Sequence, residues 1–168
     1  MFICKYCGTE FTEHKPNCPN CGAPIKASKS TTTSASSLRE VCLHYEGTDH
    51  LFIDETIDKK RMETIRASFQ IPKDETVIMV YDDTIFGNNK VGFAICTNGL
   101  YWGNDWSVES KRKRLTWEEF ATREIRLVKL QISLGKGDNL GVAGNGSDEV
   151  RETIEKMLRE IRELLNSA

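Results

Sequence analysis

Apolar residues recur along the chain at two spacings, one typical of helices and the other of strands. Met62, Ile65 and Phe69 lie three or four residues apart, so they would share one face of a helix. The sequence therefore predicts a helix over 58–69, and Pro72 prevents that helix from continuing.

A second helical pattern occupies the last part of the sequence. Its apolar positions form one stripe and the other positions are largely charged, as expected for a helix that covers a sheet or the end of a barrel. Ser147 or Asp148 is expected to cap its N-terminus. The stripe consists of Val150, Ile154, Met157, Leu158, Ile161 and Leu165.

Between these two helices the pattern changes to the alternation of strands. The β-branched run TVIMVY over Thr76–Tyr81 predicts one strand. The Asn98-Gly99 pair lies between two apolar runs and predicts a hairpin, because these residues suit a tight turn. In the first of the two runs, one face is expected to carry Val91, Phe93 and Ile95, and the other Gly92, Ala94 and Cys96.

The segment RKRLTWEEF predicts a strand that leads into a short helix, because Thr116 and Glu119 have the spacing of a capping box. The next segment, 124–144, predicts a long strand, a glycine-rich turn and a return strand. Apolar residues alternate regularly in the later part of the long strand but are out of phase before it. We therefore expect a β-bulge near Leu127–Val128.

Composition divides the 168 residues into modules. The stretch KASKSTTTSASS has no large apolar residue, so it cannot bury enough surface to order itself and predicts a flexible tether. We expect a small module over 1–26, a Ser/Thr-rich linker over 27–38, a connecting segment of ambiguous pattern over 39–53, and a larger domain over 54–168.

A helix, six or seven antiparallel strands and a C-terminal amphipathic helix predict an α+β fold, with a small barrel that the last helix closes at one end. The residues YDDTIFGNNKVGFAICTNGLYWGN (Tyr81–Asn104) and LTWEEF (Leu115–Phe120) resemble the bacterial pleckstrin-homology-like (PH-like) domain family. The resemblance covers about residues 56–166 and implies a PH-like antiparallel β-barrel capped by the C-terminal helix. It also implies binding of lipid headgroups, peptides or other domains, and it transfers no catalytic residue to this chain.

Four of the six cysteines, Cys4, Cys7, Cys18 and Cys21, have the spacing C-x2-C-x10-C-x2-C. Four sulfur ligands with no open position are typical of structural zinc, and iron is the alternative metal for the same ligands. A redox centre would need a larger βαβ context, and two disulfides would need an oxidising compartment. The stretch over about residues 2–25 resembles the zinc-ribbon domains at the N-termini of many bacterial proteins, which implies one structural Zn²⁺.

Other polar clusters give weaker signals for chemistry. His44 and His50 lie near acidic residues, but scattered surface positions explain them more simply than a second metal site. Asp82 and Asp83 are adjacent, so on a strand they would point to opposite faces, and a turn role near Gly87 is expected instead. No nucleophile–base pair, open metal site or cofactor motif is present in the sequence, so we expect no enzymatic activity.

The only dense basic run consists of Lys111, Arg112, Lys113 and Arg114. This run would bind phosphate groups, or it would protect a strand edge from pairing, which the slightly acidic net charge of −2 favours. Trp106 lies in a polar loop before the run and is the best candidate for an exposed contact. The other aromatic side chains are expected to fill the core.

We therefore expect a cytoplasmic, non-enzymatic binding or adaptor protein whose favoured partner is another protein. Nucleic-acid binding through the zinc ribbon and residues 111–114 is the first alternative, and binding of an anionic lipid surface is the second. The cytoplasmic expectation follows from the opening Met-Phe-Ile, which leads directly to Cys4 without an apolar signal segment.

Overall fold

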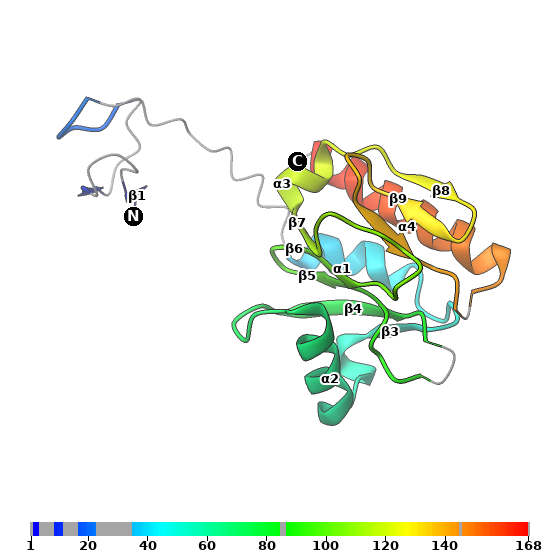
Figure 1. Ribbon diagram of the computed structural model, residues 1–168. Coiled ribbons are helices and arrows are strands. Elements are labelled where there is room, and N and C mark those ends of the chain that lie inside the picture. The colour runs from blue at the N-terminus through cyan, green and yellow to red at the C-terminus, as the bar shows by residue number, and fades with distance from the viewer. Residues whose placement is uncertain are drawn as a thin grey trace. The chain divides into compact units, whose positions relative to one another are not determined.

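The computed structural model describes residues 2–3, 9–11, 17–22, 35–84, 87–144 and 146–167. The chain forms two compact units, Met1–Thr32 and Thr33–Ala168, and both are drawn in Figure 1. In the first unit, strands β1 (Phe2–Ile3) and β2 (Glu10–Phe11) pair in antiparallel register, with Phe2 opposite Phe11.

The second unit is an α+β domain with a five-stranded sheet, a three-stranded sheet and a long C-terminal helix. Its elements in chain order are α1 (Ala35–Leu43), β3 (Leu51–Ile53), a 3-10 helix η1 (Asp54–Thr56), α2 (Lys59–Phe69), β4 (Val77–Asp82), β5 (Gly92–Cys96), β6 (Gly99–Gly103), β7 (Arg114–Thr116), α3 (Trp117–Ala121), β8 (Arg126–Val128), β9 (Gln131–Ser133), β10 (Asn139–Gly141) and α4 (Asp148–Ser167).

The five-stranded sheet has the order β3-β4-β5-β6-β7, and the three-stranded sheet has the order β10-β9-β8. All neighbouring strands are antiparallel. Within the described residues, no ladder joins the two sheets into the closed barrel that the element order predicted. Near the edge strand β7, a single backbone hydrogen bond of 3.1 Å links the Lys111 N–H to the Gly137 carbonyl oxygen. The sheets are instead joined by a shared core and by side-chain hydrogen bonds.

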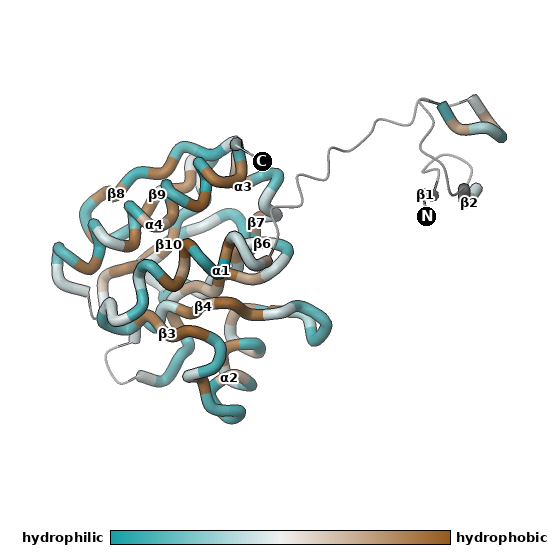
Figure 2. The backbone as a smooth tube through the Cα atoms, turned by 180° about the vertical axis from the view of Figure 1, so that it is seen from behind, coloured by the Kyte–Doolittle hydropathy of each residue, from teal (hydrophilic) through white to brown (hydrophobic). Residues whose placement is uncertain are grey.

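Different helices cover the two faces of the five-stranded sheet, with α2 on one side and α1 and α4 on the other (Figure 1). The face that carries Phe93 and Ile95 belongs to the main core, together with the buried stripe of α4. The face that carries Ala94 and Cys96 packs against α2. The predicted division is therefore confirmed for these four residues, whereas Val91 lies just before the strand. Figure 2 shows apolar residues along β3 and β4.

The helices predicted over 58–69 and at the C-terminal end are confirmed, and so is the predicted cap of the second; the caps of the first were not predicted. The carboxylate of Asp58 accepts a hydrogen bond from the Arg61 N–H, and the helix ends at Gln70, which adopts the left-handed conformation. At the start of α4, the Ser147 hydroxyl accepts from the Val150 N–H over 3.2 Å. All six apolar residues expected in the α4 stripe are buried.

The predicted hairpin and capping box are also confirmed. Strands β5 and β6 pair with Cys96 opposite Gly99, so the loop between them consists of Thr97 and Asn98. At the start of α3, Thr116 and Glu119 each bond the other's backbone N–H.

The segment 124–134 differs from its prediction. It is not one bulged strand but two short strands, β8 and β9, joined by a tight turn with Val128 opposite Gln131. Lys129 adopts a left-handed φ of 56° in that turn. The break in alternation therefore marks a reversal of the chain, not a β-bulge, and the glycine-rich turn and return strand β10 follow as predicted.

The expected linker over 27–38 ends earlier than predicted, because residues 35–38 belong to α1. Leu38, Val41 and Cys42 share one face of this helix and are buried in the main core. The rest of the segment over 39–53 forms the remainder of α1, a turn and β3. None of the described helices has the length and apolar character needed to cross a membrane.

Candidate binding site on the loop before β7

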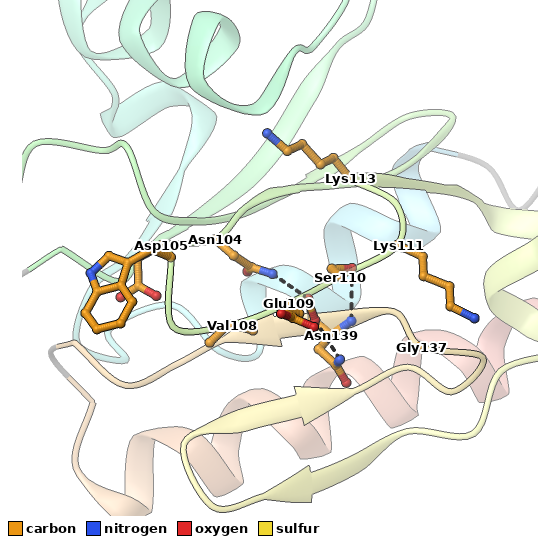
Figure 3. A pocket seen from close by; sticks show the side chains of 10 residues that line it. Asn104, Asp105, Val108, Glu109, Ser110, Lys111, Lys113, Gly137 and Asn139 are labelled. Atoms are coloured by element: carbon orange, nitrogen blue, oxygen red, sulfur yellow. Dashed lines mark hydrogen bonds between the residues drawn. The ribbon is translucent and has the colours of Figure 1, made fainter.

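The loop that joins β6 to β7 forms one wall of a surface pocket with a volume of about 600 Å³ (Figure 3). The opposite wall is contributed by the segment that contains β10. The pocket is lined by Asn104, Asp105, Trp106, Val108, Glu109, Ser110, Lys111, Lys113, Gly137 and Asn139. It therefore contains Trp106, the predicted exposed aromatic, and Lys111 and Lys113 of the basic run.

Two asparagines fasten the loop to β10. The Asn104 side chain donates to the Asn139 carbonyl oxygen over 2.8 Å and accepts from the Gly141 N–H over 2.9 Å. The Asn139 side chain returns a hydrogen bond of 2.8 Å to the Glu109 carbonyl oxygen, as Figure 3 shows. Because both ends of the loop are held by these bonds, the pocket is preorganised.

Ser110 adds a third point of attachment. Its hydroxyl accepts from the Asn139 N–H over 3.1 Å and from the indole N–H of Trp102 over 3.3 Å, and it donates to the Arg112 carbonyl oxygen. Trp102 is fully buried, so this bond connects the loop directly to the core.

Trp106 is 95% exposed, although the loop that carries it is well bonded. It lies in a tight turn, where the Asp105 carboxylate accepts hydrogen bonds from the Ser107 N–H and hydroxyl. The expectation that Trp106 is exposed is confirmed. The expectation that the remaining candidate aromatics fill the core is also confirmed, and these are Tyr101, Trp102, Trp117 and Phe120.

The four basic residues of 111–114 have different environments. Arg112 pairs with Glu119 over 2.7 Å and with Asp138 over 3.3 Å, and Arg114 lies over the ring of Tyr101. The hydrogen bond from Arg112 holds the pKa of Glu119 below its ordinary value.

Lys111 and Lys113, in contrast, line the pocket, and no described carboxylate lies within ion-pair distance of either. Their side chains extend in opposite directions from the loop (Figure 3). The run is thus not a uniform cationic patch: Arg112 and Arg114 make contacts within the domain, and the two lysines have no carboxylate partner among the described residues.

A buried ion pair between Asp138 and Arg123 also holds the loop before β7. The Asp138 carboxylate accepts from the guanidinium of Arg123 over 3.0 Å and from the Arg112 N–H over 3.1 Å. The side chains of Asp138 and Arg123 are each 2% exposed. Asp138 therefore links the β9–β10 turn, the loop before β7 and Arg123, which lies two residues after α3. No sequence pattern predicted this role.

Asp82 and Asp83 have structural roles, as expected. Asp82 accepts from the N–H and hydroxyl of Thr84, and Asp83 accepts from the N–H groups of Ala143 and Gly144, each over 3.0 Å. Among the described residues, these bonds go to Thr84 and to residues after β10, whereas the expected partners were near Gly87.

Cys18 and Cys21 belong to a tight turn in the first unit, where the Gly22 N–H donates to the Cys18 carbonyl oxygen over 2.9 Å and Gly22 has a φ of +70°. This turn suits a pair of thiolates that share one ion. The other two expected ligands, Cys4 and Cys7, lie outside the described residues.

Cys42 and Cys96 are buried in the second unit. Burial raises the pKa of the Cys42 thiol to about 12 and also raises the pKa of Cys96, so both thiols stay protonated and are poor metal ligands. Among the described residues, no group of three potential ligands surrounds His44 or His50.

No protein-family model matches the sequence, and no curated protein or solved structure is significantly similar to it.

Proposed function

We propose that this chain is a non-enzymatic binding protein, in which an N-terminal zinc ribbon is tethered to a PH-like domain that recognises a partner protein. The observation that carries the proposal is a pocket lined by Trp106, Lys111 and Lys113 on a loop that hydrogen bonds hold to β10. An exposed tryptophan costs solvation free energy until a partner covers it, and tryptophan is enriched among the residues that dominate binding energy.

The charges in the pocket favour a protein partner over nucleic acid or a lipid surface. Two arginines of the basic run are held by contacts within the domain, so fewer cations remain for phosphate groups. Asp105 and Glu109 line the same pocket and would repel a dense anionic backbone. Mixed charge around an aromatic anchor is typical of protein–protein interfaces.

In the zinc ribbon, Cys4, Cys7, Cys18 and Cys21 would hold the ion, and the turn at Cys18–Gly22 fits this role. Bound zinc would supply the folding free energy that so short a module cannot obtain from its own core. A ribbon and a larger domain on one chain allow two weak contacts to act together on the same partner.

The test is a pull-down from nuclease-treated lysate of the native host, using the full chain as bait. Trp106→Ala should lose a specific bound protein, whereas Leu43→Ser, which changes another exposed apolar side chain, should retain it. Equal recovery by Trp106→Ala and the unaltered chain would contradict the proposal. Nucleic acid recovered only when nuclease is omitted would favour the nucleic-acid alternative.

A further inference from the structure

The turn between β5 and β6 ends in an asparagine followed by a glycine, Asn98-Gly99. Such a pair is chemically labile in an unrestrained chain, because the backbone nitrogen of the glycine attacks the side-chain amide carbon of the asparagine. Glycine has no side chain to hinder that approach, and asparagine is among the thermolabile residues of proteins. Neither residue lines the binding pocket, so the pair is a candidate modification site separate from it.

The fold requires a glycine at the second position of the pair. A Cβ on Gly99 would lie 2.3 Å from the carbonyl oxygen of Leu115 on the neighbouring strand β7, a distance at which no larger residue fits. Gly99 also lies opposite Cys96 in the β5–β6 ladder. The labile pair is therefore built into the close approach of β6 and β7.

One buried carboxylate, that of Glu75, holds the asparagine. Its Oε1 accepts from the backbone N–H of Asn98 over 2.9 Å and from the side-chain Nδ2 over 3.3 Å, and its Oε2 accepts from Nδ2 over 3.2 Å. Glu75 also accepts from the hydroxyls of Thr97 and Tyr101, over 2.6 Å and 3.2 Å. Because an ionised carboxylate only accepts, these contacts fix the Asn98 amide with its nitrogen toward Glu75.

This arrangement opposes the reaction between Asn98 and Gly99. One oxygen of Glu75 binds both nitrogens of Asn98, so the side-chain amide is drawn toward the residue's own N–H. The amide must leave Glu75 and rotate before its carbon reaches the nitrogen of the next residue. Hydrogen bonds to a charged acceptor are stronger than those between neutral groups, so the folded state should slow this rearrangement.

We infer that Asn98 is a site of spontaneous deamidation, that Glu75 slows the reaction in the folded protein, and that the product destabilises the β5–β6 hairpin. In the first step the Gly99 nitrogen bonds to Cγ of Asn98, the bond from Cγ to Nδ2 breaks, and ammonia leaves with the proton from Gly99. Water then opens the succinimide ring at one of its two carbonyl carbons, which gives aspartate or isoaspartate. The net reaction consumes one water and replaces the amide with a carboxylate.

The product conflicts with Glu75. Burial alone would raise the pKa of Glu75, but its hydrogen bonds hold the pKa below the ordinary value, so this carboxylate is charged at neutral pH. Aspartate places a second carboxylate where Asn98 donated hydrogen bonds, and the two like charges repel. The effect should reach α3, because the indole N–H of Trp117 donates to the carbonyl oxygens of Cys96 and Thr97, each over 3.1 Å.

Peptide mass spectrometry of the full chain, aged in mildly alkaline buffer, measures the reaction at Asn98. The same measurement in urea gives the rate in the unfolded chain, and the other Asn-Gly pair of the sequence, Asn145-Gly146, is an internal reference. We expect deamidation of Asn98 to be at least about tenfold slower in the folded chain than in urea. In the folded chain, Glu75→Gln should accelerate it by about fivefold or more and leave the rate at Asn145 unchanged.

Asp138→Asn is the matched control for the rate. It removes the buried ion pair with Arg123 and touches neither Asn98 nor Glu75, so it separates the local restraint from unfolding of the whole domain. It should accelerate deamidation of Asn98 far less than Glu75→Gln does, and urea unfolding of both variants compares their stabilities.

Asn98→Asp represents the aspartate product. Its urea midpoint should be lower than that of the unaltered chain, because the new carboxylate faces Glu75. The loss should largely disappear when Glu75→Gln is also present, because the glutamine amide then donates to the new carboxylate. Asn88→Asp adds the same charge at an exposed position and should change the midpoint little.

Three results would overturn the inference. Equal deamidation of Asn98 in the folded chain and in urea would show that the hairpin gives no protection. Acceleration by Asp138→Asn as large as that by Glu75→Gln would assign the protection to global stability. A loss in Asn98→Asp that persists together with Glu75→Gln would show that repulsion between the two carboxylates is not its cause.

Discussion

Asp138 provides the sharpest test of how the fold supports the candidate site. Among the described residues, its carboxylate is the anion that balances the buried guanidinium of Arg123, which also donates to the Gly135 carbonyl oxygen over 3.1 Å. Asp138→Asn keeps the shape of the side chain but removes its charge. Among the described residues, the guanidinium of Arg123 would then have no counter-ion, and one of its nitrogens, Nε, already has no hydrogen-bond partner there.

Removing one member of a buried ion pair typically costs about 3–5 kcal/mol, because the remaining charge is desolvated without compensation. A loss of about 3 kcal/mol is a large part of the stability of an ordinary domain. At a slope of about 2 kcal/mol per molar urea, it lowers the unfolding midpoint by about 1.5 M. Both side chains are only 2% exposed, so removing one of them should lower the free energy of unfolding by an amount typical of buried pairs.

Urea unfolding followed by the fluorescence of the buried tryptophans measures this effect. Glu119→Gln is the matched control, because it neutralises another carboxylate that pairs with Arg112, while glutamine still completes the capping box. The Arg112–Glu119 pair is exposed and screened by solvent, so its loss should move the midpoint far less. Equal midpoint shifts for the two variants would refute the view that Asp138 balances a desolvated charge.

Three further predictions follow from individual contacts. Burial alone would raise the pKa of Glu75, but hydrogen bonds from Thr97, Asn98 and Tyr101 outweigh it and hold the pKa below the ordinary value of 4.5. Because the folded-state pKa is the lower one, this carboxylate stabilises the fold above pH 4.5 and the contribution is lost as pH falls through the folded-state pKa. Glu75→Gln should therefore reduce the acid dependence of the urea midpoint below pH 4.5, and an unchanged dependence would contradict the assignment. A Cβ at Gly144 would lie 1.7 Å from the Asp83 carbonyl oxygen, so Gly144→Ala should destabilise the domain by about 1–3 kcal/mol in urea unfolding. Gly47→Ala is its control, because no neighbouring atom of the described structure lies within 4 Å of the new Cβ, although φ there is +90°. A larger loss of unfolding free energy at Gly47 than at Gly144 would contradict the steric argument. Chelation of the metal should unfold about residues 2–25 and leave the second unit folded. Four thiols should then react with a thiol reagent, whereas Cys42 and Cys96 should react only in denaturant. Complete loss of the circular dichroism signal on chelation would show that the second unit does not stay folded without the metal.

Much of the secondary structure was predictable because it depends on local interactions. The stripe of α4, the caps of α2 and α3 and the β5–β6 hairpin all follow from residues close together in the sequence. The segment 124–134 was predicted wrongly for the same reason. A bulge and a tight turn both shift the phase of alternation, and only pairing with another strand distinguishes them.

Individual residues of the candidate site could be predicted from the sequence, but not the hydrogen bonds that bring its segments together. The neighbours of Trp106 in the sequence are mostly polar, so its exposure could be expected. The four consecutive basic residues 111–114 are evident in the sequence. The residues whose hydrogen bonds hold the loop of the pocket in place are Asn104, Ser110, Asp138 and Asn139, and no sequence pattern marks them. Their roles arise from hydrogen bonds between segments about 30 residues apart, which no local rule describes.

The sequence by itself determined three of the helices in the second unit, α2, α3 and α4, most strand positions, and the spacing of Cys4, Cys7, Cys18 and Cys21, but not helix α1. These properties depend on neighbours within a few positions, where periodicity and capping act. Only the tertiary structure decided that Arg112 is held by Asp138 while Lys111 stays without a carboxylate partner among the described residues. It also decided that the hairpin tip lies beside the loop that carries Trp106, because that proximity depends on how β10 packs between them.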